Sequence, residues 1–217
     1  MPASMLTEFS EPGNEFYCPF CVKRGDKYDF VSALRRCNDR CSKLNANELA
    51  MKAANEARLL RLYNATLPPV TGMDIRQASI DVPTVHLMEG NSLRIRDKFI
   101  PVSVGADGNC LFRAVSQSLF GNENEHEQLR LRSFIEVAQH RDFYDTSSSA
   151  FHASFKADGR LVLATYDDLL REISRPGADM DMLGVLAVSS VICRPIQTFW
   201  PIQIDSPFNR LVVVDQF

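Results

Sequence analysis

A tight turn that runs directly into a helical segment is the feature that most constrains the fold of this 217-residue chain. The turn is Gly105-Ala106-Asp107-Gly108-Asn109, in which glycine and asparagine tolerate the backbone angles of a sharp reversal. The helical pattern extends from Cys110 to Phe120, where Asn109 can cap its start and Gly121 can end it. The pattern therefore places a cysteine in the first turn of a helix.

The position of Cys110 favours nucleophilic chemistry. Unpaired backbone N–H groups and the helix dipole stabilise an anion at a helix N-terminus, so a thiol there loses its proton more readily. The same N–H groups, with those of the turn, can hold the oxyanion of a tetrahedral intermediate, and Asp107 can order the turn. This arrangement indicates a cysteine hydrolase; the alternative is that Cys110 is a small buried residue of a capped helix.

The segment from Asp107 to Val115, followed by Leu119-Phe120-Gly121, resembles the nucleophile motif of the ovarian-tumour (OTU) cysteine proteases. Supporting similarity follows at residues 129–132, 143–144, 186–192 and 194–196, so the resemblance covers about residues 95–217. It implies an α/β (α+β) papain-like fold that hydrolyses isopeptide bonds between ubiquitin and a lysine. Ubiquitin or ubiquitinated proteins would then be the partners, and catalysis would need no cofactor.

The resemblance also implies a role for each residue of the motif. Cys110 would be the nucleophile. Asp107 would be the acidic residue that serves the oxyanion loop or orients the general base. Gly108 and Asn109 would shape the oxyanion loop.

The histidines depart from the OTU pattern, which has its general base on a strand beyond the segment that matches Leu211–Val214. The histidines of this chain are His86, His126, His140 and His152, and none matches that position. We expect His140, at the end of a helix, to interact with the C-terminal carbonyls of that helix. A missing base removes roughly 10²–10⁴-fold of rate, so either the domain is C-terminally incomplete or it is an inactive copy. The strand-like ending favours an incomplete domain.

Four of the six cysteines lie within 24 residues: Cys18, Cys21, Cys37 and Cys41. Their Cys-x₂-Cys and Cys-x₃-Cys spacing is typical of a tetrahedral zinc site, with the second pair on one helix face. We expect these thiolates to bind a structural zinc ion in a zinc-finger-like module. The alternative is a small helical appendage with unliganded cysteines.

Helical signals continue on both sides of the turn. Asn45 with Glu48 forms a capping-box pattern for a helix that should end at the Pro-rich segment 66–69. Further helices are expected at residues 125–140, 167–173 and 180–192, and strands at 196–199 and 211–214. Cys193, which precedes Arg194-Pro195 at a helix end, is expected to be buried.

The net charge of −3 excludes a strongly basic nucleic-acid binder as the whole protein. Residues 18–43 nevertheless carry seven Lys/Arg against three Asp, so nucleic acid or protein could bind to the finger. No apolar run approaches the ~20 residues of a membrane span. Glu8, Glu11 and Glu15 argue against a secretory signal, and we therefore expect a cytoplasmic or nuclear protein.

These observations predict an OTU-like cysteine-type deubiquitinase behind a zinc-finger-like module. The predicted segments are a flexible N-terminus (1–14), the zinc-finger-like module (15–44), a helix with a Pro linker (45–70) and the OTU-like domain (71–217). Two alternatives stay open. One is a catalytically inactive OTU-like binding module, and the other is a mobile-element-associated zinc-finger protein that binds nucleic acid or protein.

Overall fold

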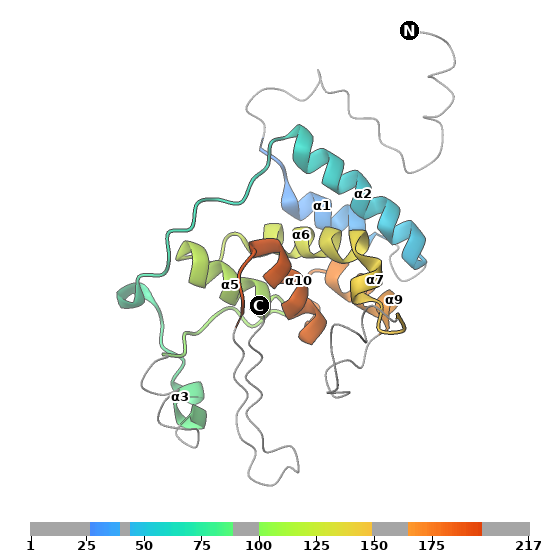
Figure 1. Ribbon diagram of the computed structural model, residues 1–217. Helices are drawn as coiled ribbons and strands as arrows, with labels where there is room; N and C mark the ends of the chain where they lie inside the picture. Colours follow the sequence, from blue (N-terminus) through green and yellow to red (C-terminus); the bar gives the residue numbers. More distant parts are fainter. Residues whose placement is uncertain (1–26, 40–43, 89–99, 149–164, 197–217) are drawn as a thin grey trace, which may run out of the picture.

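A computed structural model of the chain describes residues 27–39, 44–88, 100–148 and 165–196, and its described part is built from helices (Figure 1). In chain order these are α1 (Phe30–Asn38), α2 (Ala46–Leu62), the short 3₁₀ helix η4 (Ile75–Gln77), α3 (Val82–Met88), α5 (Cys110–Phe120), α6 (His126–Gln139), α7 (Arg141–Tyr144), α9 (Tyr166–Ser174) and α10 (Met182–Ile192). No helix among them is both long and apolar enough to cross a membrane.

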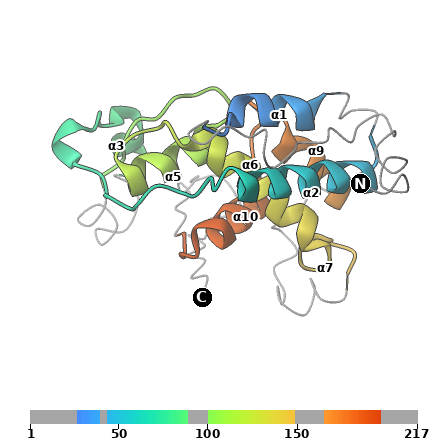
Figure 2. The same cartoon turned by 90° about the horizontal axis from the view of Figure 1, so that it is seen from above.

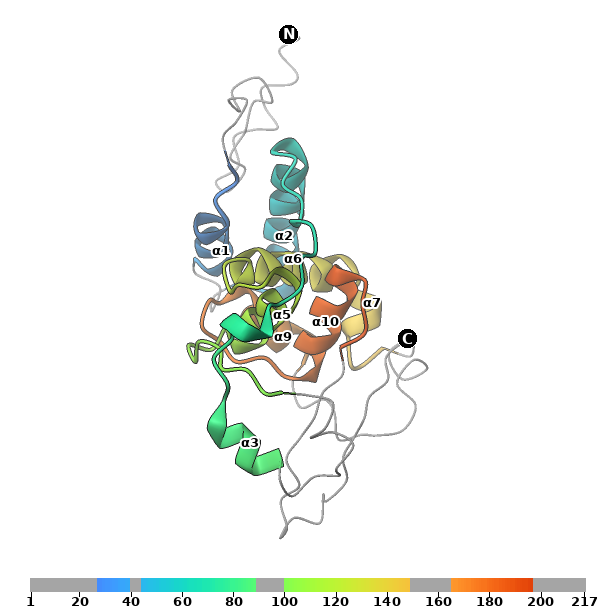
Figure 3. The same cartoon turned by 90° about the vertical axis from the view of Figure 1, so that its left-hand side faces the viewer.

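Helix α6 lies at the centre of the core. It contacts α1 and α2 on one side and α5 and α10 on the other, and α9 packs against it as well (Figures 1 and 3). Its buried residues are Gln128, Leu129, Arg130, Leu131, Ser133, Phe134, Ile135 and Val137. A helix that buries side chains around most of its circumference is a core helix, and the neighbours of α6 are positioned by it.

The helix predicted from Asn45 is confirmed, and both halves of its capping box form. The Asn45 side chain accepts a hydrogen bond from the Glu48 backbone N–H at 3.0 Å, and Glu48 accepts one from the Asn45 N–H at 2.8 Å. The helix ends at Leu62, with Asn64 in the left-handed region at φ 48°, so it stops before the predicted linker. Its apolar residues face α1 and α6, and α2 is therefore part of the core (Figure 2).

Helix α1 is held against α2 by a buried carboxylate. Glu56, only 2% exposed, accepts hydrogen bonds from the Tyr28 hydroxyl and from Arg36, whose Nε and Nη2 lie 2.9 and 3.0 Å from its oxygens. Two donors on this carboxylate offset the cost of burying its charge. The N-terminal helices thus share one core with α6, and the boundaries of the four predicted segments remain predictions.

The predicted α/β papain-like fold is wrong for the described part of the chain. That part contains helices and one isolated antiparallel bridge between Ile80 and Val102, but no sheet. The reason lies in the spacing of its apolar residues, which recur every three or four positions and are buried on helices such as α2 and α9. The two expected strands, at 196–199 and 211–214, lie outside the described residues except for Ile196.

The helices predicted on either side of Gly121 are confirmed. Helix α5 has the predicted bounds, and Gly121 ends it in the left-handed region at φ 72°. Helix α6 begins and ends within one residue of the prediction. Helices α9 and α10 match the predicted segments 167–173 and 180–192 closely. The periodic part of the sequence was therefore sufficient to find the helices that surround the site.

Candidate active site

Cys110 is the first residue of α5, and it is exposed to solvent. This exposure is not that of a small buried core residue, which was the alternative interpretation. The backbone N–H groups of the first turn of α5 have no partners within the helix, and they carry its partial positive charge. The thiol therefore lies at the N-terminal end of a helix, where a substrate can reach it.

Asp107 is fixed by two donors on each carboxylate oxygen. Its Oδ1 accepts from the Asn109 backbone N–H and from Arg113 Nε, both at 3.0 Å. Its Oδ2 accepts from Asn109 Nδ2 at 3.0 Å and from Arg113 Nη2 at 2.7 Å. The hydrogen bonds from Arg113 hold the pKa of Asp107 well below its usual range. Because a carboxylate has about four acceptor sites, this one is fully used in ordering the turn.

Arg113 extends this network to the start of the turn. Its Nη1 lies 3.1 Å from Glu123 Oε2, and Glu123 also accepts from the backbone N–H of Gly105 at 3.2 Å. The ion pair with Asp107 raises the pKa of Arg113 still further. One arginine on α5 therefore ties both ends of the turn to the helix that carries Cys110.

Asn109 does not cap α5 with its side chain, contrary to the prediction. Its buried amide is used for tertiary contacts instead. The amide oxygen accepts from the Gly177 backbone N–H at 3.1 Å and from Arg130, while the amide nitrogen donates to Asp107. The residue before the thiol is thereby connected to the segment that follows α9.

Gly108 occupies a position that only glycine fits. Its φ of +76° lies in the left-handed region, and a Cβ added there would stand 1.9 Å from the carbonyl oxygen of Gly177. A side chain would be strained by the backbone and would collide with the facing loop. The predicted oxyanion-loop residues Gly108 and Asn109 thus lie directly against Gly177.

Arg130 is the residue of this site that sequence reasoning missed. It is fully buried on α6, donates to the carbonyl oxygen of Gly108 and to the amide of Asn109, and lies over the Phe112 ring at 4.9 Å. Burial lowers its pKa to about 10, so it remains charged at neutral pH. The available signal was an arginine between Leu129 and Leu131, two leucines at positions expected to be buried.

The described histidines of α6 are bonded to their own helix or its start. His126 Nδ1 lies 2.7 Å from the carbonyl oxygen of Glu123. His140 Nδ1 lies 3.0 Å from the carbonyl oxygen of Glu136, which confirms the predicted interaction with the C-terminal carbonyls. His86 is exposed on α3, and His152 lies outside the described residues. Neither the His126 nor the His140 imidazole has a described hydrogen bond to the Cys110 thiol.

The cysteine cluster lies mostly outside the described residues, which hold only Cys37 of its four members. Cys37 is fully buried in the α1 core, and burial raises the pKa of its thiol to about 12. Helix α1 ends at Asn38, before Cys41. No group of three or more potential metal ligands occurs among the described residues. The zinc site stays a prediction.

Cys193, predicted to be buried, is exposed instead. It ends α10 in the left-handed region at φ 51°, and its Sγ lies 3.5 Å from the Ser190 carbonyl oxygen. The residue stands at the helix end, as expected, but the left-handed C-cap position leaves its side chain in solvent. Cys110 and Cys193 are thus both exposed, the first at the N-terminus of α5 and the second at the C-terminus of α10.

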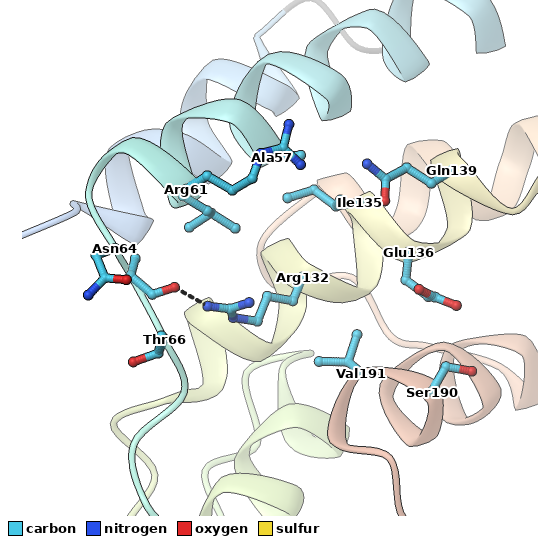
Figure 4. A pocket seen from close by; sticks show the side chains of 12 residues that line it. Ala57, Arg61, Asn64, Thr66, Arg132, Ile135, Glu136, Gln139, Ser190 and Val191 are labelled. Carbon is cyan, nitrogen blue, oxygen red and sulfur yellow. Dashed lines mark hydrogen bonds between the residues drawn. The ribbon is translucent and has the colours of Figure 1, made fainter. Parts of the chain in front are cut away.

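A separate pocket of about 500 Å³ opens where the C-terminal ends of α2 and α10 meet α6 (Figure 4). Arg132 reaches across it and donates to the Ala65 carbonyl oxygen. Its lining is Ala57, Leu60, Arg61, Asn64, Ala65, Thr66, Arg132, Ile135, Glu136, Gln139, Ser190 and Val191. None of the residues predicted for the active site belongs to it.

Known proteins resemble part of the chain. The putative ubiquitin thioesterase L96 of Tipula iridescent virus is 31% identical over 98 residues, which are 44% of this chain and 11% of the viral protein. The ovarian tumor domain-containing deubiquitinating enzyme 7 of Arabidopsis thaliana is 39% identical over 44 residues, 20% of this chain and 12% of that enzyme. The human OTU domain-containing protein 1 is 38% identical over 52 residues, 24% of this chain and 11% of that protein.

The chain therefore spans about a tenth of the length of these curated relatives. No solved structure matches it. The family described as the OTU domain of Vertnin matches residues 101–213, a segment that contains Asp107, Cys110 and Arg130. The predicted resemblance to OTU domains is confirmed, and because the match covers more than half of the chain, the chain belongs to the Vertnin OTU domain family.

Proposed function

We propose that this chain is a cysteine-type deubiquitinase-like domain that engages ubiquitin and uses Cys110 as its nucleophile. The observation that carries the proposal is the exposed thiol at the start of α5, directly behind a turn that four hydrogen bonds to Asp107 hold in place. The names of the viral and plant relatives, a putative ubiquitin thioesterase and a deubiquitinating enzyme, support ubiquitin as the substrate class.

In the proposed reaction the Cys110 thiolate attacks the carbonyl carbon at the C-terminus of ubiquitin. A C–S bond forms, and the carbonyl electron pair moves to oxygen, where backbone N–H groups at the start of α5 can stabilise the oxyanion. Collapse of the intermediate breaks the C–N bond and releases the lysine amine, which takes up a proton. Water then hydrolyses the thioester and regenerates the thiol.

The other predicted residues act on the shape of the loop. Asp107 would order the turn rather than orient a base, because its acceptor sites are occupied by Asn109 and Arg113. Gly108 and Asn109 would hold the backbone N–H groups in position through their contacts with Gly177. These roles require no metal ion or cofactor in the reaction.

A ubiquitin whose C-terminus carries an electrophile tests the proposal. We expect the full chain to form a covalent adduct at Cys110, detected by intact mass and peptide mapping. Cys110→Ala should abolish the adduct, whereas Cys193→Ala, which removes the other exposed described thiol, should leave it unchanged. Absence of an adduct in a folded wild-type chain would refute the nucleophile assignment.

A second candidate function is non-covalent ubiquitin binding by a catalytically inactive OTU domain. It is favoured by one observation: the described hydrogen bonds of His126 and His140 go to carbonyl oxygens of Glu123 and Glu136, and neither goes to Cys110. This alternative predicts that unmodified ubiquitin binds to the chain and protects Cys110 from alkylation, while the electrophilic probe gives no adduct.

We further propose that Cys18, Cys21, Cys37 and Cys41 bind one structural zinc ion. The support is the spacing of the four residues, which is typical of a tetrahedral zinc site. In addition, the lysines and arginines around them would offset the negative charge of a four-thiolate site. Metal analysis of the purified chain should give about one zinc per chain, lost in Cys18→Ser and retained in Cys193→Ser. A zinc-free chain would contradict the proposal.

Salt-sensitive binding to DNA would identify nucleic acid, rather than protein, as a partner of the basic segment.

A further inference from the structure

We propose that Arg130 is a positioning residue, which holds the turn before Cys110 against the segment that follows α9 and thereby sets the reactivity of the thiol. The inference deepens the proposed function and rests on it. Arg130 does not touch a substrate position itself, and it would act through Gly108 and Asn109.

Toward the turn, Arg130 makes two contacts through one nitrogen. Nη1 lies 3.3 Å from the carbonyl oxygen of Gly108, and it also donates to the side-chain oxygen of Asn109. These are the two residues immediately before Cys110 in the sequence. A shift of the guanidinium would therefore move the backbone whose N–H groups face the reacting atoms.

Away from the turn, the same guanidinium binds the last turn of α9 and the segment between α9 and α10. Nε lies 3.1 Å from the carbonyl oxygen of Ile173, and Nη2 lies 3.3 Å from that of Glu172 and also donates to that of Ala178. Gly177 in this segment donates to Asn109. The planar fork of an arginine can serve both sides at once, whereas the single ammonium group of a lysine cannot.

Among the described residues, no carboxylate lies in the hydrogen-bonding shell of the buried Arg130 guanidinium. All five of its described hydrogen bonds end on carbonyl or amide oxygens, and Phe112 of α5 covers the guanidinium. An apolar side chain could fill this space without the desolvation cost of a cation. The fixed geometry of the turn, together with a buried positive charge near the start of α5, is what the arginine provides.

Three described cysteines make this proposal measurable without ubiquitin. Cys110 reports the site, Cys193 is the exposed reference, and buried Cys37 reports loss of the fold. Arg132 is the matched control, because it is a partly buried arginine of the same helix whose described hydrogen bond goes to the Ala65 carbonyl oxygen and not to the turn.

The experiment is site-resolved iodoacetamide labelling of the full chain, measured as a function of pH in wild type, Arg130→Met, Arg130→Lys and Arg132→Lys. We expect both Arg130 variants to lower the Cys110-to-Cys193 rate ratio by roughly threefold and to move the Cys110 profile to higher pH. Arg132→Lys should change neither quantity. Amide hydrogen exchange should rise over residues 105–110 in the Arg130 variants only.

If an Arg130 variant exposes Cys37, the fold is lost, and Asn109→Ala takes its place. This substitution removes the acceptor in the turn but keeps the buried cation, and the same fall in the ratio is expected. An unchanged ratio and pH profile in folded variants would overturn the proposal. A normal ratio in wild type without any ubiquitin adduct would refute the proposed function but not the role of Arg130.

Discussion

The amide oxygen of Asn109 accepts a hydrogen bond from the backbone N–H of Gly177 at 3.1 Å, although 68 positions separate the two residues in the sequence. This bond joins the turn before the thiol to the loop between α9 and α10. Local turn chemistry therefore does not by itself set the geometry of the candidate active site. It is completed by a contact that only the folded chain provides.

Gly108→Ala should destabilise the chain more than Gly72→Ala. Both glycines have a left-handed φ, +76° and +74°, so both substitutions carry a backbone cost of about 1–2 kcal/mol. Only Gly108 faces a backbone atom, the Gly177 carbonyl oxygen, whereas nothing lies within 4 Å of a Cβ at Gly72. Urea unfolding of the two variants measures the difference. Equal losses would contradict the close approach of the two loops.

Asp107→Ala should affect reactivity far more than stability. The carboxylate is 45% exposed, and an exposed ion pair such as that with Arg113 contributes about 1 kcal/mol or less. Loss of its four hydrogen bonds should nevertheless loosen the turn and reduce labelling by the ubiquitin probe several-fold. Asp145→Ala is the control, because Asp145 binds Ser147 and Arg141 in a distant loop. Probe labelling that is as fast in Asp107→Ala as in wild type would remove Asp107 from the site.

Cleavage of ubiquitin chains by this 217-residue chain should be slow. If none of its histidines serves as general base, as the sequence predicts, the rate should fall at least about 10²-fold below that of a thiol protease with a catalytic histidine. His140→Ala should leave the residual rate unchanged, because its imidazole is bonded to the end of α6. Time courses with ubiquitin dimers check both statements. Fast cleavage that His140→Ala abolishes would make His140 the base, and the present interpretation would then be wrong.

Tyr144 should make the fold sensitive to alkaline pH. The side chain is fully buried, and burial raises its pKa to about 12, above the value of about 10 in an unfolded chain. The folded state thus holds the proton more tightly, so this contribution is complete below pH 10 and is lost as pH rises toward 12. The full loss amounts to about 3 kcal/mol.

Unfolding free energies of wild type and Tyr144→Phe at pH 9, 10 and 11 test this dependence. Tyr144→Phe should show a smaller fall than wild type. Ser190→Ala, which removes the hydroxyl 3.3 Å from the phenol but keeps the titrating group, should retain the wild-type slope. Identical slopes in wild type and Tyr144→Phe would show that the phenol does not titrate with unfolding.

The helices around the site were predictable because their signals are local. The capping box of Asn45 and Glu48 and the left-handed end at Gly121 depend only on neighbouring residues, and both formed. The fold class was not predictable in the same way. It was inferred from the resemblance and from short β-branched segments, and the described residues instead contain helices without a sheet.

The chemistry of the turn was predicted only in part. Cys110, Asp107, Gly108 and Asn109 stood together in the sequence, and the structure keeps them together. Arg130 and Gly177 could not be placed there, because their contacts with Asn109 join residues 21 and 68 positions apart. The side chain of Asn109 was expected to cap α5 because local rules favour it, but tertiary partners compete successfully for its amide.

Relative alkylation of Cys110 and Cys193 in the wild-type chain tests the central claim most directly. Both thiols are exposed, but Cys110 begins α5 and Cys193 ends α10, so the first lies at the positive end of a helix dipole and the second at a negative end. With limiting iodoacetamide near neutral pH, peptide mapping should find Cys110 modified several-fold faster than Cys193. Faster modification of Cys193 would contradict the assignment of Cys110 as the activated nucleophile.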